Sequence, residues 1–339
     1  MRQPHTRKGK QSKLRHMPGK KAFEQQIADL DSLRDADRRE QVQALQKALD
    51  NRNNFIVGKA ADLARELKLT QFTSALTSAF DRFLVNPEKT DPQCWAKNAI
   101  ARALAAFEYQ EPGFFLRGMR HIQLEPVWGG KSDTAGTLRA TCALALVQCR
   151  SLSETDLLGH LVGIVSDKDK AVRLEVVRAI EQVGSPAASL LLRLRAVLGS
   201  DEPEVLGACY GGILRLEGVR AISWVARFLA SADDTAAEAA LAIAATHSPE
   251  AFNALRECLD DAKDPWWRSV LLSAIALTRL DSAMEFLFDR VRAESLDAEA
   301  AIEAILRAAP SRETVTALQS IVQDNPRLAA AFAAHRSAS

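Results

Sequence analysis

The sequence lacks the features that would mark it for a membrane, for export or for a cysteine-based site. Its 339 residues contain no run of 18 or more uncharged apolar residues, and the basic N-terminus has no short apolar stretch typical of a secretory signal. The cysteines never occur as C-x-x-C, which argues against a disulfide framework and a cysteine-rich zinc site. We therefore expect a cytoplasmic protein without membrane contact, with five reduced core cysteines: Cys94, Cys142, Cys149, Cys209 and Cys258.

Acidic residues are missing from the first 23 positions, which carry eight lysines and arginines. Because the whole chain has a net charge of +1, the remaining residues sum to −7. A segment this polar cannot bury enough apolar area to offset its ordering entropy, so residues 1–22 are predicted to be a disordered basic tail. The tail is either a solvated leader or an electrostatic arm that makes weak contacts with nucleic acid through residues 2–21.

Strand signals are also scarce, because no hairpin dipeptide separates alternating β-branched runs. Apolar residues instead recur at i, i+3, i+4 and i+7, which predicts an all-α fold. The clearest helix lies in DKDKAVRLEVVRAIEQVG at 167–184, where Asp167 and Asp169 precede the helix and Gly184 ends it. Its predicted buried stripe consists of Val172, Val176, Ala179, Ile180 and Val183.

A similar helix recurs along the chain at intervals of 30 to 42 residues. A period in this range indicates stacked helical hairpins, because one helix pair cannot bury its apolar face alone. We take Val172 as the anchor position of its repeat. The corresponding anchors are Val57, Ala96, Leu138, Val205, Ala237, Trp267 and Ala298.

At 167–184 the chain resembles the HEAT-repeat family, in particular the short variety related to bacterial phycobilisome-lyase-type repeats. The shared pattern is an acidic turn, Val-Arg, spaced Ala and Leu-like residues and a final Gly; GGKSDTAGTLRATCALALVQC and DDAKDPWWRSVLLSAIALTRL follow it less fully. The resemblance extends over roughly residues 50 to 325. It implies a right-handed α-solenoid of about eight helical hairpins, whose usual work is protein recognition.

These observations predict the organisation of the chain. After the tail at 1–22, residues 23–50 form extra N-terminal helices that cap the first exposed face of the stack. The HEAT-like solenoid covers 51–325, with an insertion at 114–133. Residues 326–339 form a C-terminal helix end and a frayed tail.

The stretch VWGGKSDTAG at 127–136 contains a Gly-Gly-Lys-Ser that suggests a phosphate-binding loop. A P-loop requires G-x-x-x-x-G-K-[ST] after a strand, but the first required glycine falls on Glu125 and no strand is predicted before it. We expect instead a tight turn at Gly129-Gly130, followed by a helix that Ser132 or Asp133 caps.

The insertion that leads into this turn is the best candidate for partner binding, because insertions in repeat proteins project from one edge. An aromatic side chain among polar groups is typical of binding hot spots, although Trp128 could equally be tucked in to seal a longer turn. In a later repeat, Trp267 is an anchor, which leaves Trp266 as a surface contact. The candidate partner-binding residues are Arg117, Arg120, His121, Glu125, Trp128, Lys131 and Trp266.

The sequence offers no recognisable catalytic or cofactor constellation. His121 and Glu125 are four residues apart, but Pro126 and the glycines after it make that stretch non-helical. One histidine and one glutamate do not form a metal site, and no histidine is followed directly by glutamate as in the metal-dependent HEAT-like hydroxylases. We expect a non-enzymatic protein with no cofactor and no metal.

Basic residues that follow the anchors recur beside acidic turn residues, so we interpret them as a structural repeat ladder of charge-assisted bonds between neighbouring turns. The ladder residues are Lys97, Asp133, Arg139, Asp167, Arg173, Asp264 and Arg268.

Three functions are consistent with these features. The first is a scaffold or adaptor that binds another protein or a helical peptide, through the insertion and an inner groove of small, apolar side chains. The second is a nucleic-acid-associated protein of the HEAT-like DNA-glycosylase type, in which the basic tail helps to hold the strand. The third, from the repeat resemblance alone, is a chromophore-lyase-like helper.

Overall fold

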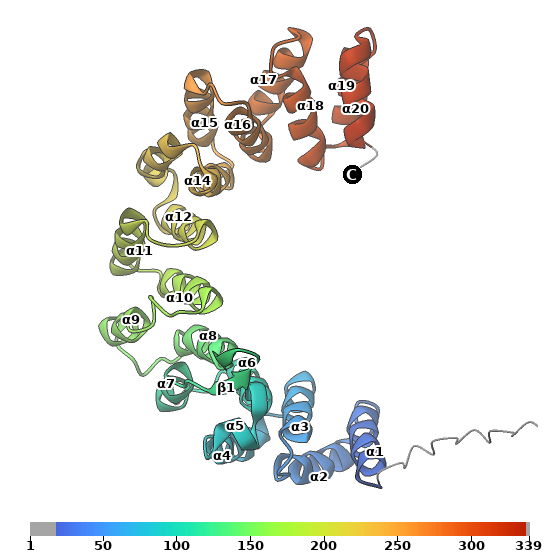
Figure 1. The fold of residues 1–339 in the computed structure, drawn as a ribbon, viewed down its shortest axis with the longest axis vertical. Coiled ribbons are helices and arrows are strands. Elements are labelled where there is room, and N and C mark those ends of the chain that lie inside the picture. Colours follow the sequence, from blue (N-terminus) through green and yellow to red (C-terminus); the bar gives the residue numbers. More distant parts are fainter. Residues whose placement is uncertain (1–17, 337–339) are drawn as a thin grey trace, which may run out of the picture. The chain divides into compact units, whose positions relative to one another are not determined.

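The computed structural model describes residues 18–336, with side chains from residue 23, and Figure 1 shows the order of the elements. Apart from one two-stranded sheet, the described residues form helices and connecting segments, so the fold is all-helical as predicted. No helix in this part of the chain is both long and apolar enough to span a membrane. The chain divides into two compact units, one ending at Cys142 and one beginning at Ala143, and each is described separately.

Unit 1 contains the first seven α-helices and the sheet. Its helices pack in pairs, with α3 against α2 and α6, and α4 against α2 and α6. The elements are α1 Pro18–Ser32, α2 Arg38–Leu49, α3 Asn54–Glu66, η1 Thr70–Phe72, α4 Thr73–Phe83, α5 Pro87–Thr90, η2 Pro92–Cys94, α6 Trp95–Ala106, α7 Pro112–Met119, β1 Leu124–Val127 and β2 Gly130–Asp133. The division between the units falls within α8 Gly136–Leu146.

Unit 2 contains the remaining helices. In this unit α10, α12, α14, α16, α18 and α20 pack one on the next, and the helices between them pack on this row. The elements are α9 Glu154–Val162, α10 Lys170–Val183, α11 Pro186–Leu198, α12 Pro203–Glu217, η3 Gly218–Ala221, α13 Ile222–Ala226, η4 Arg227–Ser231, α14 Asp234–Ala244, α15 Pro249–Asp261, α16 Pro265–Leu277, α17 Asp281–Arg292, α18 Ala298–Arg307, α19 Arg312–Val322 and α20 Pro326–Arg336.

Helix α10 shows how the local sequence sets its boundaries. The Asp169 carboxylate accepts a hydrogen bond from the Ala171 N–H at the first turn, and Gly184 ends the helix with φ 75°. Of the predicted stripe, Val172, Val176, Ala179 and Ile180 are buried and Val183 is half-buried. The helical period and the caps were therefore predicted correctly.

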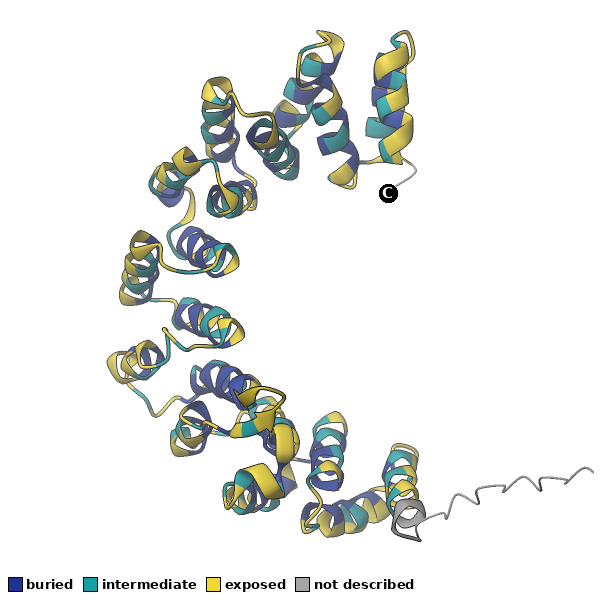
Figure 2. Ribbon diagram, viewed as in Figure 1, coloured by how far each residue is buried: buried dark blue, intermediate teal, exposed yellow. Residues whose placement is uncertain are grey.

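The anchor positions are buried in seven of the eight predicted repeats, and Figure 2 shows buried residues on the helix sides that face neighbouring helices. The exception is Ala237, which is half-buried, whereas its neighbour Ala236 has no exposed surface. The predicted anchor is wrong by one residue there. The six alanines of α14 obscured the stripe, because small apolar residues occupy both faces of the helix.

Several predicted boundaries differ from the structure. Helix α1 begins at Pro18, so the last five residues of the predicted tail 1–22 belong to a helix, and residues 1–17 lie outside the described residues. The segment 23–50 contains the rest of α1 and α2. The first six residues of the predicted insertion 114–133 complete α7, and the predicted array 51–325 extends over both compact units. Residues 337–339 of the predicted frayed tail also lie outside the described residues.

Candidate functional site

The second half of the insertion forms a β-hairpin, which the sequence analysis missed. Strands β1 and β2 pair antiparallel from Leu124↔Asp133 to Val127↔Gly130, and Trp128 and Gly129 make the two-residue turn. Gly129 has φ 88°, a left-handed conformation that favours glycine at the second position of such a turn. The tight turn is present one residue earlier than the predicted Gly129-Gly130. Of the two predicted capping residues, Ser132 lies in a strand, whereas Asp133 accepts from the Ala135 N–H just before α8.

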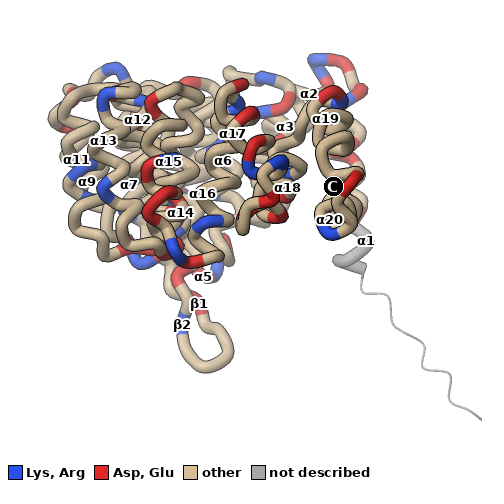
Figure 3. The backbone as a smooth tube through the Cα atoms, turned by 90° about the horizontal axis from the view of Figure 1, so that it is seen from above, with Lys and Arg blue, Asp and Glu red and all other residues tan. Residues whose placement is uncertain are grey.

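The hairpin carries an uncharged apolar tip that projects beyond the helices of its own unit (Figure 3). The Trp128 side chain is 105% exposed, and Val127 next to it is 50% exposed. The alternative of a tucked tryptophan is therefore wrong. Leu124, 54% exposed, lies at the other end of β1, opposite Asp133. Lys131 lies on β2 and is exposed beside this tip.

Gln123 and Glu125 attach the hairpin to the preceding helices. The Gln123 side chain, 2% exposed, donates from Nε2 to the Asp91 carbonyl at 2.9 Å and to Glu125 Oε1 at 2.6 Å. Glu125 Oε1 also accepts from the Gln93 N–H at 2.6 Å and the Thr134 hydroxyl at 2.8 Å. Burial alone would raise the pKa of Glu125, but these three hydrogen bonds lower it.

Asp133 closes the other end of the hairpin. Its Oδ1 accepts from the N–H groups of Gln123 and Ala135, each at 3.0 Å, and its Oδ2 lies 2.6 Å from a guanidinium nitrogen of Arg139. Arg139 is buried and also donates to the His121 carbonyl at 3.0 Å. Burial opposes ionisation of Asp133, but the two backbone donors and Arg139 outweigh it and lower the pKa. Asp133 and Arg139 thus connect the hairpin to α8.

A buried ion pair lies beneath this attachment. Lys97 and Asp91 are both fully buried, and Lys97 Nζ lies 2.9 Å from Asp91 Oδ2. Asp91 also accepts from the Ala96 and Lys97 N–H groups at the start of α6 and from the Asn54 amide on α3. The adjoining segment has left-handed backbone at Asn86, Gln93 and Cys94, which costs free energy at each non-glycine residue. The polar bonds to the hairpin and to α6 hold this segment in place.

The other predicted contact residues are divided between the two units. Arg117 on α7 pairs with Asp81 at 3.0 Å, and Arg120 is exposed at the end of α7. His121 and Glu125 belong to the root of the hairpin and not to its exposed tip. Trp266, 47% exposed, lies on α16 in unit 2, so it is not part of this group of residues.

The root of the hairpin predicts a pH dependence of its local stability. Burial lowers the pKa of His121 from its ordinary 6.5 and outweighs the hydrogen bond from the ring to Gln123, which raises the pKa. Because the unfolded chain then binds a proton that the folded state excludes, this stabilisation is complete above pH 6.5 and is lost as the pH falls through the folded pKa. The pKa values of Glu125 and Asp133 are lowered from their ordinary 4.5 and 3.8, so the stability that these two carboxylates contribute is lost only at pH below those values.

We therefore expect hydrogen exchange in peptides covering 120–139 to accelerate between pH 7 and pH 5, after correction for intrinsic rates. In His121→Gln, which retains a polar side chain but cannot titrate, this acceleration should be smaller. An equal acceleration in both proteins would contradict a role for His121.

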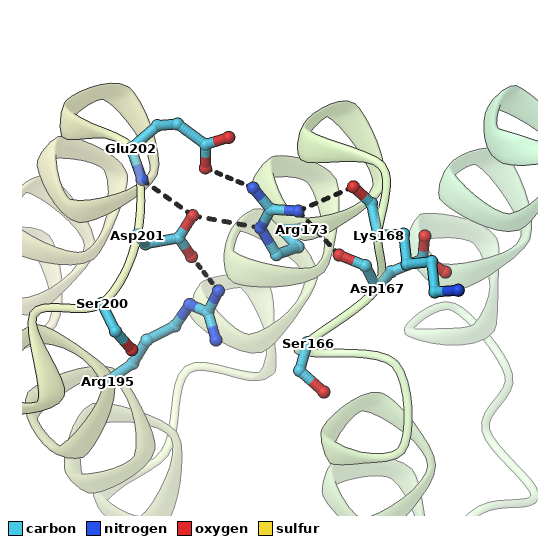
Figure 4. Close-up of a pocket in the computed structure, with 8 residues that line it drawn as sticks. All are labelled: Ser166, Asp167, Lys168, Arg173, Arg195, Ser200, Asp201 and Glu202. Atoms are coloured by element: carbon cyan, nitrogen blue, oxygen red, sulfur yellow. Dashed lines mark hydrogen bonds and ion pairs between the residues drawn. The ribbon is translucent and has the colours of Figure 1, made fainter.

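Asp167 and Arg173, two of the predicted ladder residues of unit 2, line a shallow polar pocket between the turns that precede α10 and α12 (Figure 4). Arg173 donates to the Asp167 carbonyl at 2.7 Å and contacts Asp201 Oδ1 at 3.0 Å and the Glu202 carboxylate. Arg195 contacts the other oxygen of Asp201. The side chains of the pocket therefore neutralise one another, and they link one turn to the next.

The same geometry recurs at α16, where an arginine again contacts an acidic residue of the next turn. Asp264 accepts from the Trp267 N–H and caps the helix, whereas Arg268 pairs with Asp297 before α18. Arg290 also pairs with Asp297, at 3.0 Å. Arg268 therefore bonds to an acidic residue of the following turn, in line with the predicted ladder between neighbouring turns, and Asp264 has a capping role.

Sequence reasoning missed Asp91, Asp201 and Asp297, although the first has a clear signal. Asp91 stands five residues before its anchor, as Asp133 and Asp167 do, and its cationic partner Lys97 follows the anchor directly. Asp201 and Asp297 are the acids of the next turn in each case, one repeat period after Asp167 and Asp264.

A groove between α10, α12 and α14 corresponds to the predicted inner surface. Its α12 side presents Gly207, Gly211 and Leu214, which are the second, sixth and ninth residues after the anchor Val205. With the anchor of α14 corrected to Ala236, the same offsets give Glu238, Ala242 and Ala245, and all three line the groove. Burial and then the charge of Glu204 raise the pKa of Glu238.

Within residues 18–336, no group of three or more His, Cys, Asp or Glu side chains is placed to hold a metal ion. Four of the five cysteines are buried and Cys258 is half-buried. Burial raises the pKa of Cys94 to about 11 and that of Cys209 to about 12. Comparison with known proteins gives no matching family model and no matching curated protein.

Proposed function

We propose that this chain is a non-enzymatic, protein-binding scaffold built as a right-handed α-solenoid of HEAT-like hairpins. Two observations support the repeat architecture. Buried anchors recur about once per hairpin, and in unit 2 each helix of one row packs on the next member of that row. Hairpin repeats of this kind use their insertions and inner surfaces for recognition.

The observation that carries the binding proposal is the fully exposed Trp128 at the tip of a firmly attached hairpin. A large aromatic side chain in water is unfavourable for an isolated molecule, because its apolar area remains hydrated. On the tip, Val127 extends the apolar surface without adding charge. This surface suits an uncharged recess on another protein, into which the indole ring inserts.

The root of the hairpin strengthens the proposal because it lowers the entropic cost of binding. The buried Gln123 and the paired Asp133 leave the strands little freedom at their base. A tip that is already ordered loses less conformational freedom when it docks. The bonds around Glu125 and Asp133 thus explain how a short two-stranded sheet, which is marginal alone, presents a tryptophan stably.

The groove of unit 2 is a second contact surface in this proposal. Leu241 and Ala242 provide apolar contact, whereas the space beside Gly207 and Gly211 is occupied by the side chains of Glu238 and Arg215. Glu238, Arg178 and Arg215 also line the groove, so a bound helical peptide would need polar groups of both signs beside its apolar face.

We expect Trp128→Ala to weaken partner binding by about 2 kcal/mol or more, roughly 30-fold in Kd, because buried tryptophans are common hot spots. The free energy of unfolding should change by less than about 0.5 kcal/mol, because the side chain makes no packing contribution in the free protein. Affinity purification with each protein would identify the partner, and titration calorimetry would then measure its Kd.

The matched control is Leu296→Ala, which truncates another fully exposed apolar side chain, 104% exposed, in a loop of unit 2. This variant should retain the partner with unchanged affinity. Retention of the same partner by Trp128→Ala would show that the hairpin tip is not the contact surface.

A further inference from the structure

Helix α11 presents a continuous apolar stripe to solvent, which the repeat packing does not explain. Leu190, Leu194, Val197 and Leu198 are 56% to 67% exposed. Their spacing places them on one face of the helix, together with Ala187. The opposite face packs on α10 and α12 through Ala188, Leu192 and Ala196.

The charged residues of α11 are directed away from this stripe. Arg193 pairs with Glu217, and its guanidinium lies 4.3 Å from the ring centroid of Trp224. Arg195 pairs with Asp201, of which only 4% is exposed. The solvent-facing arc of α11 therefore carries no charge over its whole length.

Helix α15, in a corresponding position two hairpins later in unit 2, shows the usual pattern. Its exposed positions include Asn253, Arg256, Glu257 and Asp260. The solvent-facing side of a helix in a repeat protein is normally polar, as it is in α15. A large apolar patch on that side is typical of an interaction site. The stripe on α11 is therefore a specific feature of this helix.

The chemistry of the stripe favours a second α11 over a membrane or a charged partner. Membrane-surface helices have lysines and arginines beside the apolar face, whereas both arginines of α11 are paired away from it. A partner protein with a charged surface would bury its charges against the stripe without gaining hydrogen bonds or ion pairs to compensate for the lost hydration. An identical stripe is apolar and uncharged along the same length, and a two-fold axis near Leu194 brings the two into register.

We propose that the α11 stripe is the interface of a homodimer in which two α11 helices pack against each other around a two-fold axis. This inference goes beyond the proposed scaffold function and does not depend on it. The stripe offers roughly 400 Å² of apolar area per copy, about half of what each partner of a standard interface buries. The dimer should therefore be weak and form in the micromolar range.

Sedimentation equilibrium of the full-length protein over a micromolar concentration series tests this inference. We expect a reversible monomer–dimer equilibrium, and Leu194→Arg should weaken it more than ten-fold, because the dimer would bring two like charges, one from each copy, into an apolar interface. Leu296→Arg, which places the same charge at an exposed position away from α11, should dimerise as the natural protein does. A monomer at every concentration, or an unchanged dimer in Leu194→Arg, would overturn the proposal.

A cysteine variant tests the same geometry without adding charge to the helix. Leu194→Cys places a thiol near the two-fold axis, whereas four natural cysteines are buried. Mild oxidation should crosslink Leu194→Cys into a covalent dimer faster than the control Leu296→Cys. Equal crosslinking of both variants, or binding of the monomer to phosphatidylcholine vesicles that Leu194→Arg abolishes, would refute the homodimer.

Discussion

Lys97→Met is expected to destabilise unit 1 by about 3–5 kcal/mol, because it removes one partner of a fully buried ion pair. Because methionine has a similar volume to lysine, the loss of stability comes mainly from the missing charge and not from a cavity. The carboxylate of Asp91 would keep its backbone donors but lose its ion pair with Lys97 Nζ, which lies 2.9 Å away. Denaturant-dependent hydrogen exchange of α6 peptides measures this free energy within unit 1 itself.

Two further variants separate the charge from the packing. Arg102 is on α6, like Lys97, and forms a more exposed ion pair with Asp62 of α3. Arg102→Met removes the cation of that pair and should lower the free energy of unfolding by less than about 1 kcal/mol. The double change Asp91→Asn with Lys97→Met removes both charges and retains an oxygen that can accept from the N–H groups of α6. It should recover most of the lost stability, and a double variant less stable than Lys97→Met would contradict this explanation.

Asp201→Ala is expected to destabilise the neighbouring turns of unit 2 by about 3 kcal/mol, because one carboxylate holds two largely buried arginines. The side chains of Arg173 and Arg195 are 13% and 15% exposed, so water replaces the lost contact poorly. Arg173 retains Glu202 and the Asp167 carbonyl, whereas Arg195 loses its ion-pair partner. Exchange rates of peptides from α10 to α12 should increase together.

The matched control for this change is Glu204→Gln, which interrupts the exposed pair with Lys170 beside the same turn. Its expected cost is below about 1 kcal/mol. If Asp201→Ala and Glu204→Gln destabilised α10 to α12 equally, the ion pairs of this pocket would have no special structural role.

The residues that were hardest to predict are those whose partners lie one turn further along the chain. Arg173 and Arg268 were recognised from their position after an anchor, but their carboxylate partners Asp201 and Asp297 belong to the next repeat. The ladder was predicted to run between neighbouring turns, but sequence spacing alone did not identify Asp201 and Asp297 as its acidic members. The reach and direction of each guanidinium depend on how the two helices pack.

The sequence by itself determined the helices, their caps and nearly all the buried anchors, because periodicity and capping act over a few residues. The tertiary structure alone decided that 124–133 pairs as a hairpin, because its root needs Asp91 and Gln93 from about 30 residues earlier. It also decided which apolar stripe remains exposed: the pattern in α11 is the same as that of a buried helix face. Whether such a face is covered depends on how neighbouring helices pack, which the sequence of α11 alone does not predict.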